Sequence, residues 1–147
     1  LRFVGTWVRD RTDYPYLDNP SQKERIKGEL GDPVYNFNVS ADYTHGPVTL
    51  GYQLRYIGRQ SITDWEAQHD TNGVAALDPY YADRVYYPSV VYHALRASVD
   101  VDQRFTMYGG VDNLTDKKPP YGLLGNGNDA IFNNVGRSMY VGARVKL

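Results

Sequence analysis

The stretch VYNFNVSADYTHGPVTLGYQLRYIGRQ, residues 34–60, decides the fold class of this chain. Apolar and polar residues alternate along it on both sides of a short break at residues 45–47. This alternation places one set of side chains on a common face: Tyr35, Phe37, Val39, Ala41, Tyr43, Val48, Leu50, Tyr52, Leu54 and Tyr56. A period of two indicates strands with one apolar and one polar face. We therefore predict two long antiparallel strands joined by a tight turn.

The same alternation recurs on both sides of this hairpin. It is clear in residues 86–101, 104–113 and 136–147. Residues 1–10 are also strand-like, but either of two sets of residues there could form the apolar face, so the register stays open. A helical period of 3.6 never persists beyond a turn or two. The sequence therefore predicts an all-β fold, an antiparallel up-and-down meander of about six long strands.

The connections between the predicted strands alternate in length. Residues 11 to about 32, 61 to about 84 and 113 to about 135 are long, whereas residues 45–47 and 102–104 are short. Short turns on one side and large loops on the other are typical of a meander through a membrane, and a tilted strand crosses the hydrocarbon layer in roughly 9 to 11 residues. Six strands are fewer than the roughly eight that close a membrane barrel. We therefore expect residues 1–147 to be the C-terminal portion of a larger transmembrane β-barrel.

Composition excludes several classes of protein. The 16 basic and 17 acidic residues give a net charge of −1, which offers no electrostatic basis for a nucleic-acid partner. The chain has no cysteine, so disulfides and thiolate metal sites are excluded. Its apolar runs are a few residues long, far below the roughly 18 of a membrane helix.

Three motifs in order resemble the C-terminal region of TonB-dependent outer-membrane receptors. YGGVDNLTDKKPPYG (108–122) resembles their NLxDK segment, and VGRSMYVGARVKL (135–147) resembles their closing strand. GELGDPVYNFNVSADYTHGPVTLGYQLRYIG (28–58) is similar to their pattern of a down strand, a Gly-containing turn and an up strand that ends in R-Y-I-G. Two departures are visible: Leu147 stands where the family commonly has Phe, and this chain carries neither the plug domain nor the segment that contacts TonB.

The resemblance implies a 22-stranded barrel in the outer membrane of a Gram-negative bacterium, plugged by an N-terminal domain. Such receptors import scarce ligands, usually ferric siderophores but also haem, cobalamin or carbohydrates, with energy passed from the TonB complex. Outer-membrane lipid, the TonB complex, a small-molecule ligand and the barrel-assembly machinery are the expected partners. The expected assembly signal on the closing strand comprises Met139, Val141, Ala143, Val145 and Leu147.

Candidate binding residues fall into two groups. The long loops carry side chains able to stack on a ligand or to form hydrogen bonds with it: Trp65, His69, Tyr80, Tyr81, Tyr121 and Asn126. Polar faces of the strands, which we expect to line the lumen, carry Gln53, Arg55, Arg96 and Arg144. These arginines either attract an anionic ligand or cross-link a hydrated interior to residues such as Asp42; the second reading is favoured.

Catalysis, cofactor binding and metal binding find no positive signal. The three histidines are scattered, and GNGNDA (125–130) lacks the strand-to-helix context of a dinucleotide site. The chain is therefore expected not to be an enzyme. Two alternatives to the receptor remain: a passive porin-like barrel, and a soluble β-domain for a ligand or partner whose apolar faces pack on a second sheet.

Overall fold

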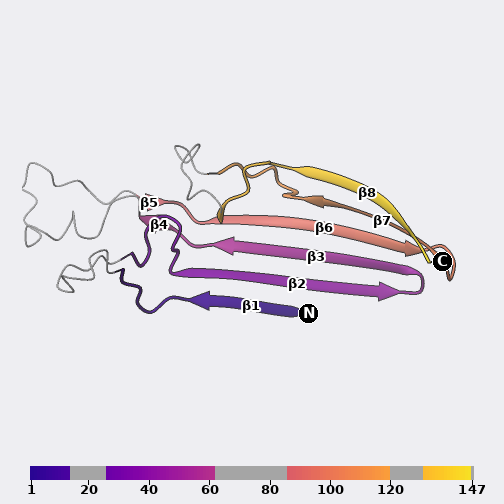
Figure 1. Cartoon of the computed structure of the whole chain (residues 1–147), viewed down its shortest axis with the longest axis horizontal. Coiled ribbons are helices and arrows are strands. Elements are labelled where there is room, and N and C mark those ends of the chain that lie inside the picture. Colours follow the sequence, from indigo (N-terminus) through magenta and orange to yellow (C-terminus); the bar gives the residue numbers. More distant parts are fainter. Residues whose placement is uncertain (14–25, 62–85, 120–130, 147) are drawn as a thin grey trace, which may run out of the picture.

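The computed structural model describes residues 1–13, 26–61, 86–119 and 131–146, and in them it forms an antiparallel meander. The strands are β1 (Arg2–Trp7), β2 (Tyr35–His45), β3 (Val48–Ile57), β4 (Gln60–Ser61), β5 (Tyr86–Tyr87), β6 (Val90–Asp100), β7 (Phe105–Asp112) and β8 (Ser138–Val145). The six long strands form one sheet in the order β1-β2-β3-β6-β7-β8, and β4 pairs with β5 in a short ladder (Figure 1). The predicted all-β meander is confirmed.

Tight turns join the strands at one end of the sheet, which we call the turn end; the opposite end is the loop end (Figure 1). At the turn between β2 and β3, His45 pairs with Val48, and Gly46 has a φ of 57°. A positive φ at the first of two loop residues matches the type II′ turn that suits a hairpin. Between β6 and β7, the Asp102 carboxylate accepts hydrogen bonds from the backbone N–H groups of Arg104 at 2.7 Å and Phe105 at 2.8 Å.

The structure differs from the sequence prediction near the loop end, where two predicted strands are interrupted. The strand expected over residues 48–60 stops at Ile57 and resumes as β4, and the one expected from residue 86 is broken between β5 and β6. Pro88 lies in the second break and has no N–H for a ladder. At the first break, the ladder to β2 extends one residue past Ile57, because the Gly58 N–H donates to the Tyr35 carbonyl oxygen at 2.8 Å.

A methyl group at Gly58 is expected to destabilise this end of the β2–β3 ladder. A Cβ there would lie 2.7 Å from the Tyr35 carbonyl oxygen, a backbone atom that cannot move aside without disturbing its hydrogen bond to the Gly58 N–H. We expect Gly58→Ala to lower the free energy of unfolding by about 1–3 kcal/mol, measured by urea unfolding of the intact protein in detergent. Gly5→Ala is the control, because its nearest contact is the tip of the exposed Phe3 ring at 3.1 Å. Equal losses in the two variants would contradict the prediction.

Strand pairing places the alternating apolar residues of all six long strands on one face, which we call the apolar face. The register that the sequence left open in the first strand is settled, because Phe3 pairs with Val39 and Trp7 pairs with Tyr35. Side chains on this face are exposed, and the exposed fraction is 51% for Leu50, 82% for Val141 and 61% for Val145. In the described part of the chain, no second sheet covers them, so the packing that a soluble sandwich requires is not found.

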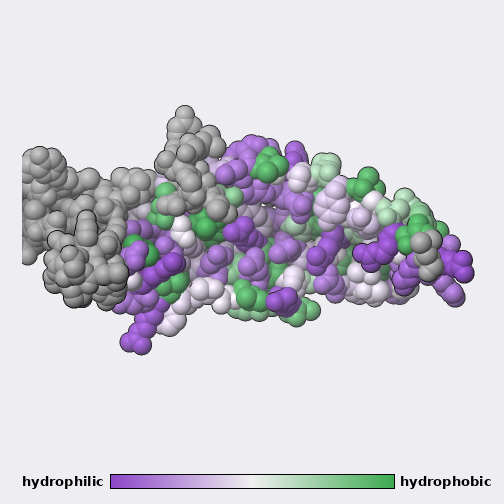
Figure 2. Space-filling model, viewed as in Figure 1, coloured by the Kyte–Doolittle hydropathy of each residue, from purple (hydrophilic) through white to green (hydrophobic). Residues whose placement is uncertain are grey.

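The opposite, polar face carries the intervening residues of each strand, and hydrophilic residues run along the middle of the sheet in Figure 2. Among the described residues, buried apolar side chains gather near the loop end in a small cluster: Ile57, Tyr87, Val90, Tyr92 and Phe132. Leu30 and Ile131 pack against it. No helix in the described residues is long and apolar enough to cross a bilayer.

Candidate functional site

A recess of about 570 Å³ opens on the polar face near the loop end. Its volume lies within the roughly 300–1,000 Å³ of small-molecule sites. It lies beside the buried cluster, so it has both polar and apolar walls. The lining residues are Gln53, Arg55, Tyr92, His93, Ala94, Asp112, Asn113, Phe132, Asn133, Asn134, Val135 and Ser138. We call it the loop-end recess.

The floor of the recess is held to the segment that precedes β8. The Arg55 guanidinium on β3 donates through Nη2 to the carbonyl oxygen of Ile131 at 2.7 Å. The backbone N–H of Asn133 donates to the Tyr92 hydroxyl oxygen on β6 at 3.0 Å. Two long-range hydrogen bonds therefore hold residues 131–133 over strands that are far away in the sequence.

One wall of the recess is the turn that follows β7, which we call the Asn113 turn (residues 113–117). Asn113 is 2% exposed, and its side chain both accepts from the Lys117 N–H at 2.8 Å and donates to the Lys117 carbonyl at 2.9 Å. The Leu114 N–H donates to the His93 carbonyl at 2.8 Å, which attaches the turn to β6. Asn113 and Asp116 have φ values of 50° and 52°, a conformation that Asn and Asp tolerate better than most residues.

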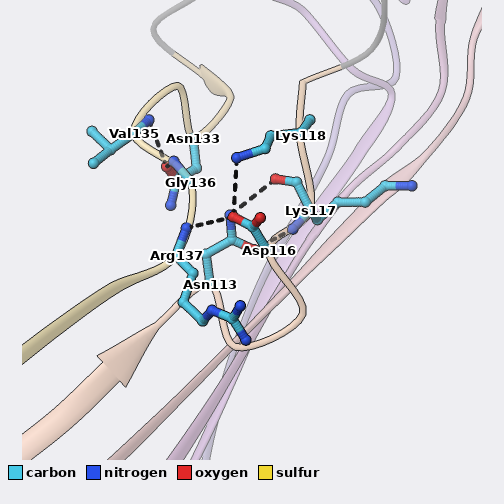
Figure 3. Close-up of polar contacts among 8 residues, drawn as sticks. All are labelled: Asn113, Asp116, Lys117, Lys118, Asn133, Val135, Gly136 and Arg137. Atoms are coloured by element: carbon cyan, nitrogen blue, oxygen red, sulfur yellow. Dashed lines mark hydrogen bonds and ion pairs between the residues drawn. The ribbon is translucent and has the colours of Figure 1, made fainter.

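The Asn113 turn also holds the start of β8, as Figure 3 shows. The Asp116 carboxylate accepts from the Arg137 backbone N–H at 2.8 Å and from the Lys118 ammonium at 3.1 Å. The Asn133 side-chain oxygen accepts from the N–H groups of Val135 at 3.0 Å and Gly136 at 3.1 Å. The NLTDK stretch therefore fixes where the last strand begins relative to β6 and β7.

Asp116 makes this attachment sensitive to acid. The Arg137 backbone hydrogen bond, and after it the Lys118 hydrogen bond, hold the pKa of Asp116 below its ordinary value of 3.8. Because the unfolded chain takes up the proton first, the contribution of Asp116 to stability is complete above pH 3.8 and is lost as the pH falls through the lowered pKa.

We therefore expect the urea midpoint of the wild type to fall more steeply with acid than that of Asp116→Asn, whose side chain does not titrate. The measurement is a series of urea unfolding curves from about pH 5 to about pH 3, where carboxyl groups take up protons. Parallel curves for the two proteins would contradict this role of Asp116.

The recess offers the chemistry of recognition by hydrogen bonds. Arg55 and the amides of Gln53, Asn133 and Asn134 are donors, Asp112 is an acceptor, and Phe132 supplies an apolar wall. These side chains include one cation, Arg55, and one carboxylate, Asp112, so their charges sum to zero. Across the described residues, no three His, Asp or Glu side chains are grouped so that they could hold a metal ion.

The four polar-face residues expected from the sequence do not gather at one place. Gln53 and Arg55 line the loop-end recess. Arg96 forms an ion pair with Asp42 at 3.0 Å. Such a contact is expected if this arginine cross-links the polar face. Arg144 lies in a separate groove near the turn end.

The structure describes only some of the other residues that were predicted from the sequence. Met139, Val141, Ala143 and Val145 lie on the apolar face of β8. The remaining candidates fall outside the described residues: Trp65, His69, Tyr80, Tyr81, Tyr121, Asn126 and Leu147.

The sequence analysis missed several residues that line the recess. Tyr92, Asn133, Asn134 and Ser138 were not singled out. The Asn-Asn pair at 133–134, so close to the start of a strand, was the available signal, because Asn often bonds to nearby backbone groups in turns.

Comparison with known proteins shows a similar fold in one solved structure but does not show a family. No protein-family model matches the sequence, and no curated protein matches it. A point mutant of the ferric enterobactin receptor of Pseudomonas aeruginosa has a similar structure, with a TM-score of 0.50 and 18% identity over 84% of this chain. The likeness is one of fold. This chain spans 19% of that receptor's length.

Proposed function

We propose that this chain is the C-terminal part of the wall of a TonB-dependent outer-membrane transporter that imports a scarce ligand such as a ferric siderophore. The observation that carries the proposal is the continuous exposed apolar face of a sheet whose other face is polar. Lipid is the environment that such an apolar face suits, and a hydrated lumen suits the polar one.

The edges of the sheet support the same proposal. In the described part of the chain, β1 pairs with β2 alone and β8 pairs with β7 alone, so each has a free edge. Backbone groups on such edges have to be paired inside a bilayer, because lipid offers them no hydrogen bonds. Further strands of a 22-stranded barrel would pair with both edges. The fold shared with the ferric enterobactin receptor is in keeping with this arrangement.

In this proposal each part of the sheet has a role. The loop end faces the cell exterior, and the loop-end recess is one of the surfaces that a ligand meets on its way into the lumen. Strand β8 is read by the barrel-assembly machinery. Segments outside this chain supply the plug and the contact with the TonB complex.

The proposal is tested by uptake in the bacterium that carries the protein. Uptake of radiolabelled ferric siderophores is measured in the wild type, in a strain that lacks the gene, and in a strain that lacks TonB. We expect loss of the gene and loss of TonB each to abolish uptake of at least one complex. Uptake that needs the gene but persists without TonB would assign the protein to passive barrels instead. Recovery of the protein in a soluble fraction would overturn both readings.

A further inference from the structure

A second groove, of about 650 Å³, lies on the polar face at the turn end. Three cationic side chains line it: Arg104 beside the β6–β7 turn, and Arg144 and Lys146 from β8 and the residue after it. Asp100 and Asp102 also line it. We call it the basic groove; it lies at the opposite end of the sheet from the loop-end recess.

Two of the cations oppose each other across neighbouring chain segments. The Lys146 N–H donates to the Arg104 carbonyl oxygen at 2.8 Å, one step beyond the pairing of Phe105 with Val145. Arg104 and Lys146 are therefore cross-strand neighbours. Like charges placed directly opposite in a sheet are destabilising. An anion between them would reverse the sign of this interaction.

The two carboxylates in the groove form hydrogen bonds with neutral donors and keep their negative charge, so three cations and two carboxylates give the groove a net charge of +1. Asp100 accepts a hydrogen bond from the Thr106 hydroxyl at 2.6 Å. Asp102 accepts from two backbone N–H groups of its own turn. Within the described ranges, neither forms an ion pair with any of the three cations, in contrast to Arg96, whose charge is matched by Asp42.

We propose that the basic groove binds an extended acidic peptide segment that carries carboxylates at alternate positions. Arg144 and Lys146 are two residues apart on one face of a strand, which separates them by about 7 Å. Side chains at positions i and i+2 of an extended partner have the same spacing, so two Glu or Asp residues can meet both cations together. Arg104 lies opposite Lys146 and gives the second carboxylate another donor.

A peptide suits this groove better than a small anion does. The three cations extend along an open surface, and a single hydrated phosphate can reach only part of the set. Arginine forks form two-point contacts with carboxylates as well as with phosphate, so the extent of the set of cations is what favours a peptide. The proposal concerns the turn end and does not depend on which ligand enters at the loop end.

The test uses the intact protein in detergent and a fluorescent peptide with a Glu-x-Glu-x-Glu core, with a Gln-x-Gln-x-Gln peptide as the neutral probe. Binding is followed by anisotropy at low and moderate salt. We expect the acidic peptide to bind at least tenfold more tightly than the neutral one, and the difference to shrink as salt rises. A triple variant, Arg104→Gln with Arg144→Gln and Lys146→Gln, is expected to lose this preference.

Arg96→Gln is the matched control, because it removes a cation of the same face that already has a carboxylate partner. It is expected to keep the preference for the acidic peptide. Equal binding of the two peptides, or an unchanged preference in the triple variant, would overturn the proposal. So would full displacement of the peptide by inorganic phosphate at equal ionic strength, which would assign the groove to small anions.

A stability measurement on the peptide-free protein keeps the proposal open to refutation even if binding is weak. Arg104→Gln relieves the opposition to Lys146, so the Tm is expected to stay the same or rise slightly. A clear fall in Tm would mean that Arg104 is already matched by an anion of the protein itself, which contradicts a free groove.

Discussion

Replacement of Asn113 by Ala is expected to lower the free energy of unfolding by about 2–3 kcal/mol. The side chain makes two hydrogen bonds to the Lys117 backbone, and each contributes on the order of 1 kcal/mol net. Ala also has no side-chain group to support the φ of 50°, which costs a non-Gly residue roughly 1 kcal/mol or more. The change is measured by urea unfolding of the intact protein in detergent.

Two further variants separate the causes. Asn113→Asp keeps the acceptor for the Lys117 N–H and tolerates positive φ, so we expect a smaller loss than with Ala. Leu114→Ala is the local control, since Leu114 is exposed in the same turn. If Asn113→Ala were no worse than Leu114→Ala, the side-chain clasp on Lys117 would have no energetic importance.

The second large effect is expected on the apolar face. Leu95 lies at the middle of β6, on the side that the proposed function assigns to lipid. An arginine at the bilayer midplane of a barrel costs about 2–4 kcal/mol. We therefore expect Leu95→Arg to reduce stability in phospholipid vesicles by that amount, measured as the shift in the unfolding midpoint.

The control is a residue at a matching position along the strands but on the polar face. Gln53 pairs with Ala94, the neighbour of Leu95, and its exposed side chain is on the polar face. Gln53→Arg is expected to change stability by less than about 0.5 kcal/mol, because surface substitutions exposed to water are usually tolerated. Equal costs in the two variants would count against a lipid-facing assignment for the apolar face.

The two faces of the sheet could be predicted, because the alternation of apolar and polar residues is visible within each strand. Alternation in residues 34–60 was enough to place Leu50 and Gln53 on opposite faces, and the pairing of β2 with β3 agrees with that expectation. The first strand could not be assigned a face from sequence, because apolar residues occur at both parities there. Its register was settled only by pairing with β2, a long-range interaction that no local pattern records.

The loop-end recess was harder to predict for a related reason. Its parts come from β3, β6, the Asn113 turn and residues 132–138, and they meet through contacts such as the one from Arg55 to Ile131. Residues 131–136 have no period of their own; hydrogen bonds with the distant Arg55 and Tyr92, and local bonds to the Asn133 side chain, hold them in place. The sequence identified Arg55 as a polar-face residue, but the Asn-Asn pair at 133–134 indicated only a turn and not that this turn would lie over Arg55.

The sheet is only one layer thick, and this affects which substitutions its sequence can accept during evolution. Over most of its area, neither face meets another layer of the described chain, so few side chains have to match the shape of a particular neighbour. If the apolar face meets lipid, as the proposed function has it, a substitution on these surfaces is accepted whenever it keeps its preference for water or for hydrocarbon. Residue identities can then turn over while the ladder of main-chain bonds persists, which accounts for a shared architecture at 18% identity.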